Sequence, residues 1–140
     1  ARNDEIEVWA STLVIAECLH VEKGSTSVPE PVRELFIRLL EAGHPVKLQS
    51  VDIFIAERAR SLLWDHGIRC GRSADTIHVA TAIELGCEEF ISTNAKRGPL
   101  NADAAATLSD VFGLRVIEAP QTQILPPKYH LPLIDGPGTS

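Results

Sequence analysis

The stretch from Ser73 to Lys96, SADTIHVATAIELGCEEFISTNAK, combines a predicted helix, a predicted strand and an acid in the first helical turn. Ser73 is a candidate N-cap and Gly86 a stop signal, so a helix is predicted between them. This helix is apolar on almost every side, which is typical of a buried helix. Asp75 lies in its first turn, with His78 three residues later on the same face. We expect the Asp75 carboxylate to have a partner and His78 to be a packed or capped histidine, because hard cations seldom use imidazole ligands.

Length and composition indicate one ordinary globular domain. The chain has 140 residues, a hydrophobic fraction of 44% and a formal net charge of -6. This acidic balance disfavours a simple nucleic-acid binder unless metal ions or a local basic patch bridge the partner. No apolar run reaches the roughly 18 residues of a membrane span and no secretory leader opens the chain, so we expect a cytoplasmic location. Cys18, Cys70 and Cys87 lack metal-finger spacing and are predicted to be core or near-core thiols.

Strands and helices alternate along the predicted chain. The patterns predict strands at 5–10, 46–51, 89–93 and 114–118, and helices at 11–20, 52–66, 73–85 and 101–112. A further helix is predicted to begin at Pro29 or Pro31 and to end at Gly43. This order is typical of the α/β class, with a mostly parallel central sheet, helices on both faces and a site at the carboxyl ends of the strands. In the helix at 52–66 the residues expected to face inward are Ile53, Ala56, Ala59 and Leu63. Prolines and glycines after residue 118 predict an extended or disordered tail over 119–140, beyond a domain over 1–118.

Two acids carry the predicted chemistry. Glu17 lies in the predicted helix at 11–20, which is otherwise almost wholly apolar, and Asp75 opens the central helix. A parallel sheet would place both at one edge, facing one another. Carboxylates in apolar surroundings are protonated, paired or bound to a cation. Because Mg²⁺ and Mn²⁺ prefer oxygen ligands and activate water, these acids favour a metal-dependent nuclease, which is compatible with the acidic net charge.

Three motifs resemble the PIN-domain family. They are STLVIAE at Ser11–Glu17, SADTIHVATA at Ser73–Ala82 and FISTN at Phe90–Asn94, and the resemblance covers about Glu5 to Glu118. It implies a three-layer α/β/α nuclease fold in which carboxylates bind one or two Mg²⁺ or Mn²⁺ ions for RNA hydrolysis. Many bacterial members are VapC-type toxins of toxin–antitoxin pairs, so the implied partners are an RNA substrate, an antitoxin protein and a second copy of the chain.

The resemblance also assigns site residues. Glu17 and Asp75 match the family's second and third acids and are expected to be catalytic and metal-binding, while Thr93 and Asn94 are candidate cofactor-binding residues. The match departs from the family twice. Ala95 stands where a fourth acid usually follows, and the opening strand that carries the first acid is expected upstream of this chain. We therefore expect an N-terminally incomplete domain that cleaves RNA weakly or not at all.

Each candidate also has a structural alternative. The sole role of Asp75 can be to stabilise the helix through a favourable interaction with its dipole, and Glu17 can be a solvated surface residue. Thr93 and Asn94 can be ordinary turn residues. Several cationic side chains near these acids could bind phosphate, although most cations on a protein surface have no such role. They are Arg69, Arg72, Lys96 and Arg97. Two functions therefore stay open, a metal-dependent ribonuclease and a degenerate PIN-like module that binds RNA or a protein without cleavage.

Overall fold

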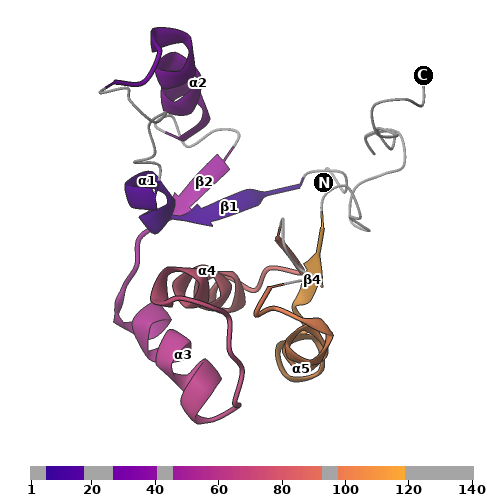
Figure 1. Ribbon diagram of the computed structural model, residues 1–140. Helices are drawn as coiled ribbons and strands as arrows, with labels where there is room; N and C mark the ends of the chain where they lie inside the picture. Colours follow the sequence, from indigo (N-terminus) through magenta and orange to yellow (C-terminus); the bar gives the residue numbers. More distant parts are fainter. Residues whose placement is uncertain (1–5, 18–26, 41–45, 93–97, 119–140) are drawn as a thin grey trace, which may run out of the picture.

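The computed structural model describes residues 6–17, 27–40, 46–92 and 98–118 (Figure 1). All the predicted helices and strands are present, with ends that differ by a few residues from those expected. In chain order they are β1 (Val8–Ser11), α1 (Leu13–Glu17), α2 (Glu30–Leu40), β2 (Val46–Gln49), α3 (Ile53–Trp64), α4 (Ser73–Glu84), β3 (Glu89–Ile91), α5 (Ala102–Phe112) and β4 (Arg115–Ile117). The segment 119–140, predicted to be a tail, lies outside the described residues.

The strands form two parallel pairs. β1 pairs with β2 in the register Val8↔Val46, and β3 pairs with β4 in the register Glu89↔Arg115. The predicted α/β class with parallel strands is confirmed. The single central sheet is not, because within the described residues no ladder joins the two pairs. A sheet is continuous only where neighbouring strands lie about 4.8 Å apart, and β1 and β3 each have one such neighbour in the described part of the chain.

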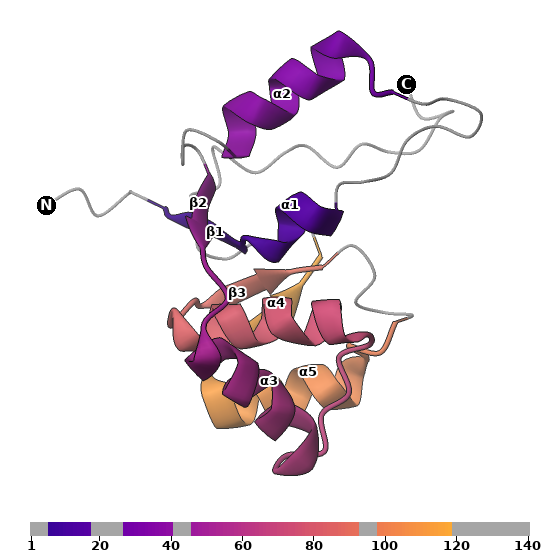
Figure 2. The same ribbon diagram turned by 90° about the vertical axis from the view of Figure 1, so that its left-hand side faces the viewer.

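Helices lie on both sides of the β1–β2 pair, as the alternation predicts. α2 packs against β2, whereas α4 packs against β1 on the opposite side and also contacts β3 (Figures 1 and 2). α3 packs on α4, and α5 packs on β4. α4 is therefore the element that both strand pairs share.

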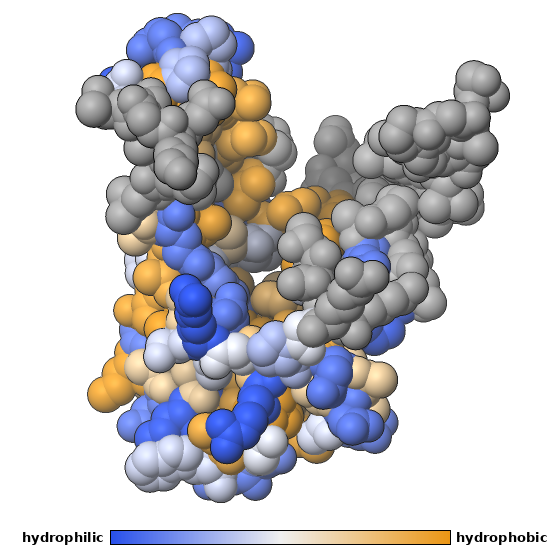
Figure 3. All heavy atoms as spheres, in the orientation of Figure 1, coloured by the Kyte–Doolittle hydropathy of each residue, from blue (hydrophilic) through white to orange (hydrophobic). Residues whose placement is uncertain are grey.

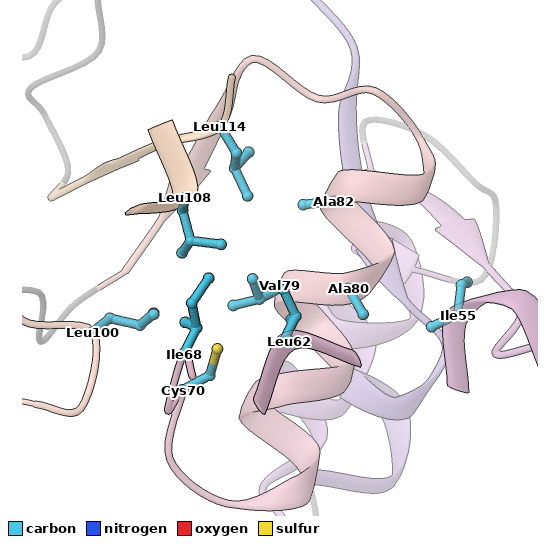
Figure 4. Close-up of a cluster of buried hydrophobic side chains, with 10 residues drawn as sticks. All are labelled: Ile55, Leu62, Ile68, Cys70, Val79, Ala80, Ala82, Leu100, Leu108 and Leu114. Carbon is cyan, nitrogen blue, oxygen red and sulfur yellow. The ribbon is translucent and has the colours of Figure 1, made fainter. Parts of the chain in front are cut away.

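The hydrophobic core is built around α4 (Figure 4). Within α4, Val79, Ala80, Thr81 and Ala82 are all buried. Because successive helical residues point about 100° apart, four consecutive buried residues mean that this part of the helix is enclosed on every side. The other buried apolar residues of this core are Ile55, Leu62, Ile68, Cys70, Leu100, Leu108 and Leu114. The prediction of a buried central helix is confirmed for this part of α4, and its first turn is more open.

The buried face of α3 differs from the predicted one. Ile55 and Leu62 are buried, whereas Ile53 is 70% exposed and Leu63 is 40% exposed. Of the residues predicted to face inward, Ala59 does pack against the core. Asp52 caps the helix, since its Oδ1 accepts a hydrogen bond from the Ile55 N–H at 3.0 Å. The helix begins with three consecutive large apolar residues, so the sequence allows more than one inward face. Packing against α4 selects the face that carries positions 55 and 62.

The apolar stripe of α2 is largely exposed. Val32, Leu35 and Leu39 lie on the surface, although Phe36 is half-buried. Figure 3 shows apolar residues on the surface at this end of the molecule. α2 is therefore an amphipathic helix, as predicted, whose apolar side is only partly covered within the described residues.

Candidate functional site

Glu17 is the last residue of α1. The Ser11 hydroxyl, buried at the end of β1, accepts a hydrogen bond from the Leu13 N–H at 3.1 Å and starts the helix directly after the strand. No residue of α1 is buried, so the prediction that apolar surroundings enclose Glu17 is wrong for Leu13–Glu17. A helix of five residues covers little surface, and its side chains stay partly in solvent. Glu17 is therefore an accessible carboxylate near the carboxyl end of β1.

Asp75 lies in the first turn of α4, as predicted, and its carboxylate has a backbone partner. The N-cap is Arg72 rather than the predicted Ser73, which is the first helical residue. Asp75 Oδ2 accepts a hydrogen bond from the Arg72 N–H at 3.0 Å. A carboxylate at this position also interacts favourably with the helix dipole. Asp75 therefore stabilises the helix start. It is also exposed, and no hydrogen bond from a described residue engages its Oδ1.

The loop before α4 makes room for the Asp75 carboxylate. Gly71 has a φ of +112°, and a Cβ at this position would lie 2.7 Å from Asp75 Oδ2. Only glycine adopts such a backbone readily and leaves that space free. Sequence reasoning missed Gly71, although a glycine just before a helix start that carries an acid is a readable signal.

Cys70 is a buried thiol close to Asp75. Burial raises the pKa of the Cys70 thiol to about 11, and the nearby negative charge of Asp75 adds to the shift. Cys87 is half-buried, and burial raises its pKa too, with a smaller contribution from Glu7. The prediction of core or near-core thiols is confirmed for these two residues, whereas Cys18 lies outside the described residues.

The structure brings Glu17 to His78. Glu17 Oε1 is hydrogen-bonded to His78 Nε2, across a separation of 61 residues in the sequence. α1 lies close to α4 in Figure 2. His78 is three residues after Asp75, so the two share one face of α4, about 4.5 Å apart along its axis. The Glu17 carboxylate is thus held on the face of α4 that carries Asp75. The sequence suggested a packed or capped His78 but did not reveal its partner.

Other predicted site residues fall outside the described part of the chain. Thr93, Asn94 and Ala95 lie there, as do Lys96 and Arg97. Arg69 and Arg72 are described and exposed, close in sequence to Asp75. The structure therefore locates the two acids but not the strand end that follows β3.

The described residues include ligands of the type that a hard metal ion prefers, but too few of them lie together to hold one. Glu17 and Asp75 offer the carboxylate oxygens that Mg²⁺ and Mn²⁺ prefer. Within 6–17, 27–40, 46–92 and 98–118, however, no three His, Cys, Asp or Glu side chains converge in a way that could hold a metal ion. A complete site would need further ligands.

Comparison with models of protein families shows the family of this chain. A family model for the PIN domain matches residues 1–97, which is more than half of the chain and includes both Glu17 and Asp75. The chain belongs to the PIN domain family. This confirms the resemblance drawn from the three motifs. PIN domains have a nuclease-type fold and generally depend on divalent metal ions.

Two further comparisons gave no similar protein. Neither the curated proteins nor the solved structures gave a match to this PIN domain. Among the helices that the structure describes, none has the length and apolar character needed to cross a membrane.

Proposed function

We propose that this PIN domain is a metal-dependent ribonuclease in which Glu17 and Asp75 are ligands of Mg²⁺ or Mn²⁺. The observation that carries the proposal is the contact between Glu17 and His78, which holds one acid on the α4 face that carries the other. Both carboxylates are exposed, so an ion and a phosphate group can reach them. A divalent ion held there would supply an activated water and neutralise phosphate charge.

The other ligands in this proposal come from beyond the described residues. Thr93 and Asn94 can offer neutral oxygens, whereas Ala95 cannot. Hard cations also complete their coordination shell with water. The first acid of the family is expected on an opening strand. The toxin role, an antitoxin partner, a homodimer and a cytoplasmic location remain predictions from the sequence.

The test is a thermal melt with and without millimolar Mn²⁺ or Mg²⁺, paired with digestion of single-stranded RNA. We expect the ions to raise the melting temperature, because a ligand that binds only the folded state stabilises it. Asp75→Asn and Glu17→Gln should both abolish that rise and any cleavage. Asp103→Asn is the matched control, because Asp103 is also an exposed acid in a first helical turn, that of α5.

Asp75→Asn should still fold. The asparagine side-chain oxygen can accept the hydrogen bond from the Arg72 N–H, so the free energy of unfolding should change by no more than about 1 kcal/mol. An equal response to the ions in the wild type, Asp75→Asn and Asp103→Asn would contradict the assigned ligands.

The alternative is a degenerate PIN-like module that binds RNA or a protein without cleaving it. The described residues do not assemble three metal ligands, and Ala95 replaces a family acid, and both observations favour this reading. A protein that binds single-stranded RNA in a gel-shift assay, with neither cleavage nor a response to the ions, would establish it.

A further inference from the structure

His78 links the candidate site to the core. It lies on α4 immediately before Val79 and Ala80, both of which are fully buried. Its own side chain is 21% exposed, compared with 40% for Glu17. α4 is therefore fixed by packing, whereas α1 has no buried residue. In this pair the imidazole is the better-held group and the carboxylate is the group that would otherwise sample several rotamers.

The bond also leaves part of the carboxylate accessible. An ionised carboxylate only accepts hydrogen bonds, so the imidazole Nε2–H must be the donor. Glu17 uses Oε1 in this contact, and no hydrogen bond from the described part of the chain engages its Oε2. One oxygen is thus anchored while the other stays available, on the α4 face that carries Asp75. A second hydrogen-bonded partner commonly orients a metal-binding side chain in this way.

We propose that His78 is a positioning residue for Glu17, in that its Nε2–H holds one carboxylate oxygen and so fixes the direction in which the other oxygen faces. The proposal rests on the proposed function where it treats Glu17 as a metal ligand. It does not require His78 to bind the ion, and a histidine that is neutral with the proton on Nε2 serves as well as a charged one.

The first experiment tests the contact in metal-free protein. A double-mutant cycle is measured by chemical denaturation. It compares the wild type, His78→Ala, Glu17→Gln and the double variant. We expect the shifts of the denaturation midpoint to be non-additive. Each substitution should lower the midpoint clearly less in the variant that already carries the other than it does in the wild type. Additive shifts would overturn the proposal whatever the metal response. A parallel cycle with His66→Ala and Glu17→Gln is the control, because His66 packs against Phe112 instead.

The second experiment measures the apparent Kd for Mn²⁺ by titration. His78→Ala should weaken binding by about 10-fold or more, as is typical when a residue that orients a metal ligand is lost. His78→Gln keeps a side-chain N–H donor and should recover most of the affinity, which a role in packing alone would not explain. Circular dichroism verifies that each variant is folded, and the glutamine variant keeps the test valid should the alanine variant unfold.

The outcomes separate this proposal from the proposed function. Unchanged Mn²⁺ affinity in His78→Ala, with affinity lost in Glu17→Gln, overturns the His78 role and leaves the proposed function standing. Coupling between His78 and Glu17 in a wild type that shows no response to Mn²⁺ refutes the metal-dependent function while supporting His78 as the residue that holds Glu17.

Discussion

At the residue scale, the start of α4 depends on a glycine that accommodates an acid. Gly71 adopts a φ of +112° and leaves room for Asp75 Oδ2, which bonds the Arg72 N–H. A side chain at position 71 would displace that oxygen and break the bond at the helix start. The same displacement would move a proposed metal ligand, so helix stability and metal binding are coupled at this position.

Gly71→Ala should therefore lower the free energy of unfolding by about 1–3 kcal/mol, because it combines an unfavourable φ with loss of the Asp75 position. Gly86→Ala is the control, since Gly86 has a φ of +69° but no atom within 4 Å of its would-be Cβ. That control should cost about 1 kcal/mol from backbone strain alone. Chemical denaturation measures both, and equal losses would show that the Asp75 contact contributes nothing.

The Cys70 thiol predicts a loss of stability at alkaline pH. Its pKa is about 11 in the folded protein, compared with an ordinary value of 9.0. Between these values the thiol is protonated in the folded state and ionised in the unfolded state, so the unfolded state binds fewer protons. The contribution is fully present below pH 9 and is lost as the pH rises through 11.

Urea unfolding from pH 8 to pH 11 measures this effect. We expect the wild type to lose more stability over that range than Cys70→Ala does, because alanine removes the shifted group. Identical pH profiles for the two proteins would indicate that Cys70 titrates normally in the folded state.

At the element scale, two neighbouring leucines of α3 test which face is buried. Leu62 is fully buried and Leu63 is 40% exposed, although the hydrophobic pattern alone favoured Leu63. Leu62→Ala should lower the free energy of unfolding by about 2–5 kcal/mol through lost burial and a cavity, and Leu63→Ala by less than about 1.5 kcal/mol. Thermal or urea unfolding compares the two variants. A larger loss of stability in Leu63→Ala than in Leu62→Ala would mean that the face predicted from the sequence is the buried one.

At the scale of the whole molecule, the core cluster lies on one side of the fold. All its buried apolar residues lie between Ile55 and Leu114, and β1, β2, α1 and α2 contribute none of them. Regions with few buried contacts open at lower free energy than the core does. The part that carries Glu17 is thus tied less firmly than the part that carries Asp75.

Native-state hydrogen exchange should resolve this difference. The amides of Val79–Ala82 should exchange only with global unfolding, whereas those of the β1–β2 pair should exchange through a smaller opening. Mn²⁺ should slow exchange in β1 and α1 if the ion bridges Glu17 to Asp75 on α4. Equal protection of β1 and α4 without metal would mean that the two parts unfold as one unit.

The sequence by itself determined the order of helices and strands, the α/β class, the buried centre of α4 and the two candidate acids. These features depend on local signals, namely apolar periodicity, stop glycines and a motif with fixed spacing. Only the tertiary structure decided which face of α3 is buried, that the described strands form two pairs, and that Glu17 is exposed and bonded to His78. Contacts between residues 61 positions apart depend on how whole elements pack, and packing selects among inward faces that the local pattern leaves equally apolar.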